Sequence, residues 1–286
     1  MTQPQAEQQD QLEYLQPWLA AGPSPPPGWQ PLSTLRLVII VGVTGTGKTT
    51  ATKNLAKNGL NFQLLPDRRF LTDKLIIAPL QREDGQEVKT LPRIQRVPYI
   101  RRYKQRHPAG LAYAISKLFI DPAACGGFWI FNGLRGPAEV RFAIDAIPRA
   151  EFLILDASEI VRAQRLIKRK DPYDRMIKGE KESSTGDGDM NRFEALGVPK
   201  AAAIFSPQEQ AQLLEMAKSE HFAAADVRNI LELLCLERRL YDKDATIATL
   251  NSLAPERTCL IDTTDLSAGE VAQKMIGRLR ELDVLG

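Results

Sequence analysis

Cysteine and histidine are scarce in this chain of 286 residues. The three cysteines, Cys125, Cys235 and Cys259, lie far apart, are odd in number and show no CxxC spacing. The two histidines, His107 and His221, do not form a metal-binding cluster either. The sequence therefore argues against a disulfide framework and a zinc site, and it predicts a protein of a reducing compartment.

Long hydrophobic runs are absent as well. No apolar stretch approaches the roughly 20 residues needed to cross a bilayer, and the N-terminal segment lacks the basic and then apolar pattern of a signal peptide. Hydrophobic residues make up 43% and charged residues 26% of the chain, as in an ordinary globular protein. We expect a cytoplasmic protein without a membrane segment. The net charge of +3 is too small to indicate a partner.

Two segments lack charges of one sign. Residues 1–34 contain no lysine or arginine and include the run GPSPPPG. We therefore expect a flexible tail over residues 1–30, in which a short helix could form around residues 11–20. Residues 89–120 contain no acidic residue, and their basic residues are Lys89, Arg93, Arg96, Arg101, Arg102, Lys104, Arg106 and Lys117. That segment predicts an anionic partner.

The most informative stretch begins with a strand pattern at residues 36–41. The β-branched run there predicts a central parallel strand. The next eight residues, GVTGTGKT at 42–49, match the pattern GxxxxGK[S/T]. Residues 49–60 have the pattern of a helix that Gly59 stops. A strand, a glycine-rich loop and a helix in this order form the context that a phosphate-binding loop requires.

Each residue type in this loop suits nucleotide phosphates. Glycine permits positive φ, so the N–H groups of residues 45–49 can converge on phosphate oxygens near the positive end of the helix. Lys48 can reach the β- and γ-phosphates, and the Thr49 hydroxyl can ligate Mg²⁺. No NKxD motif for guanine recognition occurs, so we expect ATP with Mg²⁺. The predicted nucleotide-binding residues are Gly42, Thr44, Gly45, Thr46, Gly47, Lys48, Thr49 and Thr50.

Strand and helix patterns alternate along the rest of the chain, which predicts an α/β fold. Further strands are expected at residues 61–65, 127–136, 150–158 and from 258 onward. Together these patterns predict a three-layer P-loop NTPase fold with a central parallel sheet over residues 31–286. An α-helical insert at 176–257 is expected to interrupt it, and capping boxes mark helix starts at Ser206 and Ser267.

The order of three later motifs resembles the nucleoside monophosphate kinase-like family of P-loop phosphotransferases. The motifs are WIFNGLRGPAEVRFAI (129–144), FLILDASEIVRAQRLIKRKDPYDR (152–175) and LIDTTDLSAGEVAQKM (260–275). The resemblance covers residues 35–175 and 257–282 in pieces. It implies transfer of the ATP γ-phosphate to a small phosphorylated acceptor, which Arg135 would hold. A lid arginine would contact the transferring group, and we prefer Arg169 because a polar, Gly/Ser-rich loop follows it.

The metal site departs from that pattern. Asn132 stands where the family usually has an aspartate that positions Mg²⁺, and an asparagine can hydrogen-bond to a metal-bound water but brings no charge. Asp67 or Asp156 could take the metal role instead. Asp67 ends the second strand and could be a catalytic carboxylate or a helix N-cap. Asp156 completes an apolar run and would be structural in a kinase but would bind Mg²⁺ in an ATPase.

Two other functions remain open on the sequence. The protein could be a P-loop ATPase that acts as a conformational or regulatory switch. It could also be a kinase of nucleic-acid ends, because Tyr99 and Tyr103 lie among the basic residues of 89–120 and could stack on bases. Arg162, Arg165 and Arg169 share one helix face and could bind phosphate or form a solvated surface. The acceptor and the oligomeric state do not follow from the sequence.

Overall fold

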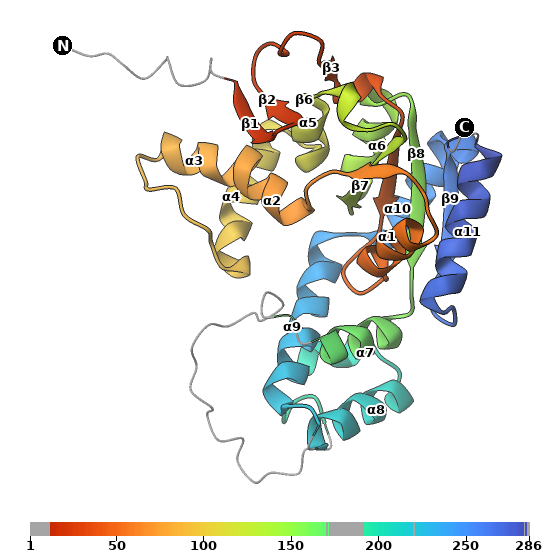
Figure 1. The fold of residues 1–286 in the computed structure, drawn as a ribbon. Coiled ribbons are helices and arrows are strands. Elements are labelled where there is room, and N and C mark those ends of the chain that lie inside the picture. Colours follow the sequence, from red (N-terminus) through yellow and green to blue (C-terminus); the bar gives the residue numbers. More distant parts are fainter. Residues whose placement is uncertain (1–11, 170, 172–191, 220, 283, 285–286) are drawn as a thin grey trace.

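A parallel sheet of five strands forms the centre of the computed structural model (Figure 1). The structure describes residues 12–169, 171, 192–219, 221–282 and 284. The strands lie in the order β5-β7-β4-β8-β9, and every neighbouring pair is parallel. They are β4 (Leu37–Val41), β5 (Phe62–Leu64), β7 (Phe128–Leu134), β8 (Ala150–Asp156) and β9 (Thr258–Asp262). The predicted α/β fold with a central parallel sheet is confirmed.

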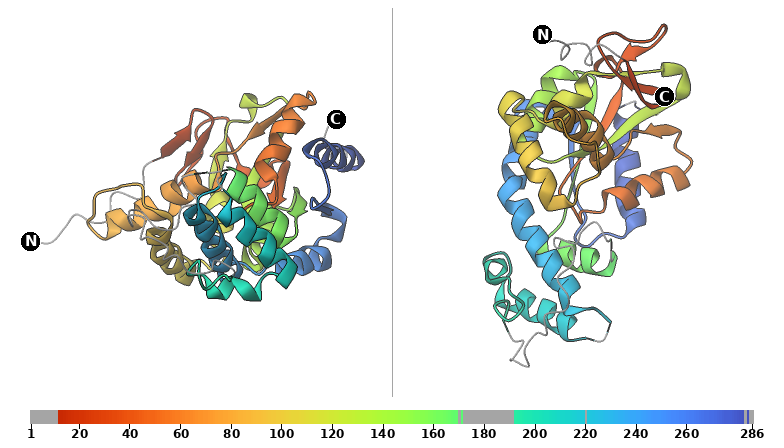
Figure 2. Two further views of the ribbon diagram at one scale, coloured as in Figure 1. Left: turned by 90° about the horizontal axis from the view of Figure 1, so that it is seen from below. Right: turned by 90° about the vertical axis from the view of Figure 1, so that its left-hand side faces the viewer.

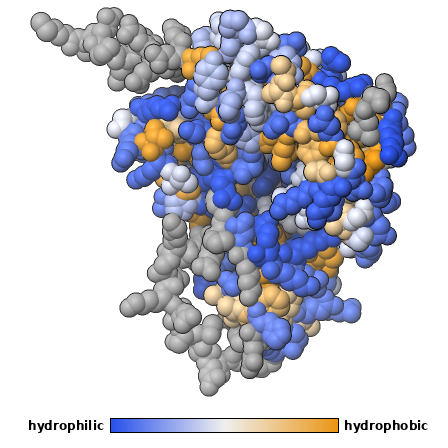
Figure 3. All heavy atoms as spheres, in the orientation of Figure 1, coloured by the Kyte–Doolittle hydropathy of each residue, from blue (hydrophilic) through white to orange (hydrophobic). Residues whose placement is uncertain are grey.

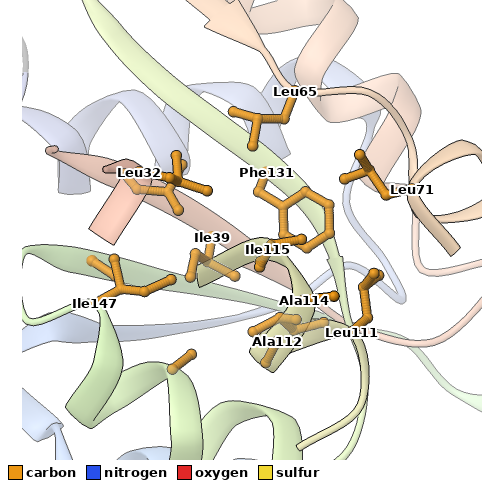
Figure 4. Packing of buried hydrophobic residues seen from close by; sticks show 14 of the residues in the cluster. Leu32, Ile39, Leu65, Leu71, Leu111, Ala112, Ala114, Ile115, Phe131 and Ile147 are labelled. Carbon is orange, nitrogen blue, oxygen red and sulfur yellow. The ribbon is translucent and has the colours of Figure 1, made fainter. Parts of the chain in front are cut away.

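Helices cover both faces of this sheet, so the predicted three layers are present. Successive residues of β4 alternate between two cores: Ile39 packs into one apolar cluster and Ile40 into the other. Figure 4 shows part of the first cluster, with Phe131 of β7 lying among Ile39, Leu71 and Ile115. The helices that flank the sheet are α1 (Lys48–Lys57), α5 (Leu111–Ser116), α6 (Pro137–Ala146), α10 (Lys243–Leu253) and α11 (Ala268–Glu281).

A run of short helices follows β5 and leads to the longer α4. One turn of it is π-helical, and 3₁₀ turns occur elsewhere in the described chain. The helices of this run are α2 (Arg68–Thr72), the π-helical turn Asp73–Ile77, α3 (Ala78–Glu83) and α4 (Arg93–Arg106). The 3₁₀ turns are Leu32–Thr34, Pro122–Ala124, Pro199–Ala203 and Pro255–Arg257.

The N-terminal segment forms strands. A second, antiparallel sheet in the order β1-β2-β6-β3 contains β1 (Glu13–Gln16), β2 (Leu19–Ala21), β3 (Gln30–Pro31) and β6 (Leu118–Ile120). Leu19 is fully buried, and the ring of Trp18 lies 5.2 Å from that of Trp129. The expected flexible tail and short helix are therefore wrong for residues 12–30, while residues 1–11 lie outside the described chain. The strand that orders this segment, β6, lies about 100 residues further along, so the local composition could not reveal the pairing.

The described residues of the range 192–257 fold mainly into helices, as expected for the insert. Their helices include α8 (Pro207–Lys218) and α9 (Ala224–Leu240), which pack with α7 (Glu159–Arg169) around a separate apolar cluster. Figure 2 shows the long α9 running from this cluster to the body that contains the sheet. The predicted capping boxes at Ser206 and Ser267 are both present. The division into a core and an insert at 176–257 remains a proposal, since α10 packs on α6 of the main body.

Within the described residues, no helix has both the length and the apolar character needed to cross a membrane.

Candidate functional site

The glycine-rich loop links β4 to α1 at the carboxyl edge of the sheet. Gly45 and Gly47 both have φ near +90°, a conformation that strains residues with a side chain. A Cβ on Gly42 would lie 2.5 Å from the carbonyl oxygen of Leu155, and one on Gly45 would lie 3.2 Å from Arg162. Gly47 is the N-cap of α1, so no capping side chain occupies the first N–H groups of the helix. The positive end of α1 faces the loop. The loop has the backbone of an anion-binding cradle.

This loop forms one wall of a cavity of about 920 Å³. Of the predicted nucleotide-binding residues, all except Gly42 line it. The cavity continues past the loop to residues that follow β5 and β7, so one space joins the expected nucleotide side to the expected acceptor side. In the face that Figure 3 displays, hydrophilic side chains predominate around the hollow at the middle of the molecule. Other lining residues include Lys53, Asp67, Arg68, Arg69, Arg93, Asn132, Arg135, Arg165, Lys168, Arg169, Asp171 and Leu266.

The side chain of Lys48 folds back onto the glycine-rich loop. Its Nζ atom donates to the carbonyl oxygen of Val43 at 2.6 Å. Burial lowers the pKa of Lys48 well below its usual value, and the positive charges of Arg135 and Arg162 lower it further, while Glu237 opposes them. A lysine in this environment gains from an anionic ligand, because phosphate oxygens would restore the charged form.

Glu237 of α9 is the central charged residue of the site, and the sequence interpretation did not include it. Its side chain is 2% exposed. Oε1 accepts hydrogen bonds from Arg93 Nη2 at 3.1 Å, from Arg135 Nη1 at 2.7 Å and from the Thr44 hydroxyl. Oε2 accepts from Arg162 Nη2 at 2.8 Å and from the Thr44 N–H at 3.1 Å. One carboxylate thus joins the insert helices, three arginines and the glycine-rich loop.

The electrostatics of Glu237 follow from these contacts. Burial alone would raise the pKa of Glu237, but Arg135, Arg93 and Arg162 outweigh it and lower the pKa to about 2. A sequence signal for this residue existed. Val227, Ile230 and Leu234 define the buried stripe of α9, and Glu237 continues it at helical spacing. An acid on a core-facing stripe indicates a buried partner of opposite charge.

The predicted arginines have different surroundings. Arg135 lines the cavity, and its Nε is buried without a hydrogen-bond partner among the described residues. Arg162 lies 3% exposed behind the loop, where Nε donates to the carbonyl of Thr44 and Nη1 to Glu159. Arg162 therefore holds the loop in place. Arg165 lines the cavity and donates to Thr263 through Nη1 at 2.9 Å and Nη2 at 2.6 Å.

Arg169 also lines the cavity, with Nη2 3.7 Å from a carboxylate oxygen of Asp171 and its side chain 43% exposed. Its lid role stays a prediction, because residue 170, residues 172–191 and with them Arg175 lie outside the described chain.

Three predicted polar residues meet at the cavity and fit a magnesium ion. Asn132 Oδ1 is buried and has no hydrogen-bond partner among the described residues, although it lines the same space as Thr49 and Asp67. Asp67 also caps α2 by accepting from the Phe70 N–H at 2.8 Å, so both roles weighed for it are compatible. Among the described residues, no three or more His, Cys, Asp or Glu side chains gather to hold a metal by themselves.

Asp156 is not placed to bind a metal ion in the cavity. Its carboxylate pairs with Lys243 of α10, and it is not among the residues that line the cavity. Of the residues weighed for a metal role, Thr49, Asn132 and Asp67 line the cavity and could offer oxygen ligands to Mg²⁺, with phosphates and waters completing a shell.

Four of the eight basic residues in the segment form ion pairs with acids from other elements. Arg102 binds Asp84 at 2.6 Å and Glu83 at 2.8 Å, and Arg106 binds Glu83 at 3.0 Å. Arg96 pairs with Asp73 at 3.0 Å, and Arg93 with Glu237. Counting acids within 89–120 missed these partners because they lie outside the segment, in residues 73–84 and in α9. Binding of nucleic acid by this surface stays a prediction.

Known proteins are only distantly similar to this chain. No protein-family model matches the sequence, and no curated protein matches it. Among solved structures, a gluconokinase from Sinorhizobium meliloti 1021 shares 14% identity at a TM-score of 0.36, covering 87% of this chain and 94% of its own. A sugar kinase from Janibacter sp. HTCC2649 shares 16% at 0.35, covering 87% and 95%. A shikimate kinase from Acinetobacter baumannii in complex with shikimate shares 14% at 0.33, covering 88% and 97%. Similarities this low do not identify the reaction or the substrate of this chain.

Proposed function

We propose that this protein is an ATP-dependent phosphotransferase that moves the γ-phosphoryl group of ATP to a small phosphorylated acceptor. The observation that carries the proposal is that one cavity is lined both by the glycine-rich loop and by Asp67, Asn132 and Arg135. A nucleotide and a small acceptor bound in one space can meet without crossing solvent. Phosphoryl transfer needs mainly this positioning together with neutralised charge.

The loop supplies the nucleotide half of the site. The N–H groups of residues 45–49 would bind phosphate oxygens, and Lys48 would leave the Val43 carbonyl for the β- and γ-phosphates. Thr44 contributes differently, because its N–H and its hydroxyl both donate to Glu237. Bound Mg²⁺ would supply positive charge at the phosphates, and Thr49 and Asn132 would hold it.

The residues that follow β5 and β7 would supply the acceptor half. Arg135 would bind the acceptor phosphate, and its buried Nε, which has no hydrogen-bond partner among the described residues, provides a donor for that purpose. In the reaction, an oxygen of the acceptor bonds to the γ-phosphorus while the bond from that phosphorus to the bridging oxygen of ADP breaks. A phosphate acceptor brings an anionic oxygen and needs no base. A hydroxyl acceptor would need one, and the Asp67 carboxylate lines the cavity and could take its proton.

Two observations weigh against the alternatives. An ATPase that uses Asp156 for Mg²⁺ would have to break the ion pair with Lys243. A kinase of nucleic-acid ends would have to share its basic segment with the acids that already pair with Arg96, Arg102 and Arg106. We therefore keep the small-acceptor kinase as the proposed function.

The test is ADP formation from ATP·Mg²⁺ with single acceptors. The panel holds nucleoside monophosphates, small hydroxyl compounds and a short oligonucleotide. Lys48→Ala should abolish turnover, while Lys57→Ala on the same helix, an exposed residue, should leave it unchanged. Stimulation by one small phosphate acceptor supports the proposal. Slow turnover indifferent to every acceptor would contradict it and favour an ATP-dependent switch.

A further inference from the structure

The carboxylate of Glu237 lies behind the cavity wall. Arg93 and Arg135 both line the cavity, whereas Glu237 and Arg162 do not. The side chains of Arg93 and Arg135 are 13% and 17% exposed, against 2% for Glu237. The guanidinium groups of Arg93 and Arg135 therefore face the cavity, and the buried carboxylate of Glu237 lies behind them.

We infer that Glu237 is a positioning residue of the phosphoryl-transfer site, which holds Arg93 and Arg135 together at the cavity and fixes the glycine-rich loop at Thr44. This inference rests on the proposed function. It adds a residue from the helical insert to a site otherwise built on the sheet, and it makes the pair of arginines, rather than Arg135 alone, the receptor for a phosphate group.

The charges explain why a carboxylate is needed at this place. Arg93 and Arg135 share the same oxygen, Oε1, at 3.1 Å and 2.7 Å. Two guanidinium groups this close repel each other, and burial weakens the screening by water. The shared anion cancels the repulsion and sets the distance between them. Removing its charge would let the two arginines separate in the absence of a ligand.

The position of Glu237 in its helix supports the same conclusion. It lies in the last turn of α9, where the helix dipole disfavours a negative charge. Burial disfavours that charge further. The arginines and Thr44 are the groups that compensate for both costs. The contacts of Glu237 with the arginines and Thr44 therefore explain why an acid occupies this unfavourable position.

The ligand chemistry follows from the two arginines. A planar guanidinium forms paired hydrogen bonds with phosphate oxygens, and two of them match a group with two negative charges better than a carboxylate. The shared ligand chemistry is therefore a phosphate dianion. It could belong to the acceptor or to the γ-phosphate of ATP, which the test below separates.

The experiment measures ligand binding by calorimetry, so it does not depend on turnover. ADP·Mg²⁺, a non-hydrolysable ATP analogue, and inorganic phosphate added to each nucleotide complex are the probes. Variants are Glu237→Gln, Glu237→Asp and Arg93→Ala. Glu232→Gln is the matched control on α9, where it loses only a surface pair with Arg228, and Arg141→Ala is an exposed control on α6.

Glu237→Gln should bind phosphate about tenfold or more weakly than the wild type, with ADP affinity within a few-fold. Glu237→Asp, which keeps the charge but shortens the reach, should lie between. Combining Glu237→Gln with Arg93→Ala should cost less than the product of the single losses, because Glu237 acts through Arg93. A purely structural role would give multiplicative losses. If the variants bind inorganic phosphate more weakly when the ATP analogue is already bound, the arginines hold the acceptor phosphate. If the variants bind the ATP analogue itself more weakly, the arginines hold its γ-phosphate.

Three outcomes would overturn the inference. The first is a folded Glu237→Gln, or a folded Glu237→Asp if the former does not fold, that binds phosphate like the wild type. The second is a fully multiplicative double variant. The third is wild-type protein that binds neither nucleotide, which would overturn the proposed function as well. Nucleotide binding with an unchanged Glu237→Gln would overturn this inference alone.

Discussion

Lys243 of α10 and Asp156 at the end of β8 form an ion pair, with Nζ 3.1 Å from Oδ1 and 3.0 Å from Oδ2. β8 runs beside β4, the strand that leads into the glycine-rich loop, but Asp156 at its end does not line the cavity. The lysine neutralises it there. The pair also ties α10 to the sheet, which gives Asp156 a structural purpose that an isolated sequence pattern does not reveal.

Substitutions at two candidate metal residues should therefore change Mg²⁺-dependent nucleotide binding to different extents. Asp156→Asn should change Mg²⁺-dependent nucleotide affinity less than about threefold and cost ~1 kcal/mol of stability at most, because the pair is partly exposed. Asn132→Asp should strengthen Mg²⁺-nucleotide binding by about tenfold, since it adds a carboxylate to the cavity wall. Titration of nucleotide binding with Mg²⁺ checks both. A large loss in Asp156→Asn would restore the ATPase interpretation.

Glycine-to-alanine substitutions at two left-handed positions should separate backbone strain from ligand binding. Gly45→Ala combines φ near +90° with a Cβ 3.2 Å from Arg162, so the loop must shift. Gly59→Ala has φ near +79° but open space around it. Each should cost about 1–2 kcal/mol through the strained backbone alone. Only Gly45→Ala should abolish nucleotide binding, measured by calorimetry beside urea unfolding. Normal binding by Gly45→Ala would contradict the cradle geometry.

The sequence predicted the elements whose signals are local. The apolar run before GVTGTGKT, the strands at residues 61–65 and 150–158 and the capping boxes at Ser206 and Ser267 all appear in the structure. Each depends on neighbours within a few residues, so composition and spacing suffice. The parallel sheet then follows, because strands alternate with helices.

The errors and omissions all involve partners distant in sequence. Leu19 is buried because β2 pairs with β6, and the acid count of 89–120 missed Glu83 and Asp84 at the end of α3. Glu237 is 193 residues from Thr44, the loop residue that it binds. No local pattern could assign it to the nucleotide site, although its place on a buried helix stripe signalled a buried charge.

Nucleotide binding should take up a proton at Lys48. Burial, with Arg135 second, lowers the pKa of Lys48 in the ligand-free protein, and phosphate oxygens would raise it again. A group whose pKa rises on binding gains a proton in the pH range between its two pKa values, so nucleotide affinity should fall as pH rises through that range. Calorimetry in buffers of different ionisation enthalpy measures the uptake. Lys48→Arg, which stays charged, should show none, and equal uptake in both proteins would contradict the assignment.

Acid should weaken the fold through Glu237. Its folded pKa of about 2 lies below its ordinary value of 4.5, so its stabilisation is complete above about pH 4.5 and is lost as pH falls toward 2. The two values correspond to about 3 kcal/mol, as an order of magnitude. Glu237→Gln should be less stable than the wild type by about this amount at neutral pH, and the gap should narrow below pH 4.5, because a protonated glutamate resembles glutamine. Urea unfolding at several pH values measures it. Glu232→Gln, which loses a surface pair, should cost less than ~1 kcal/mol. A gap for Glu237→Gln that stays constant down to acid pH would mean that packing, not charge, ties α9 to the loop.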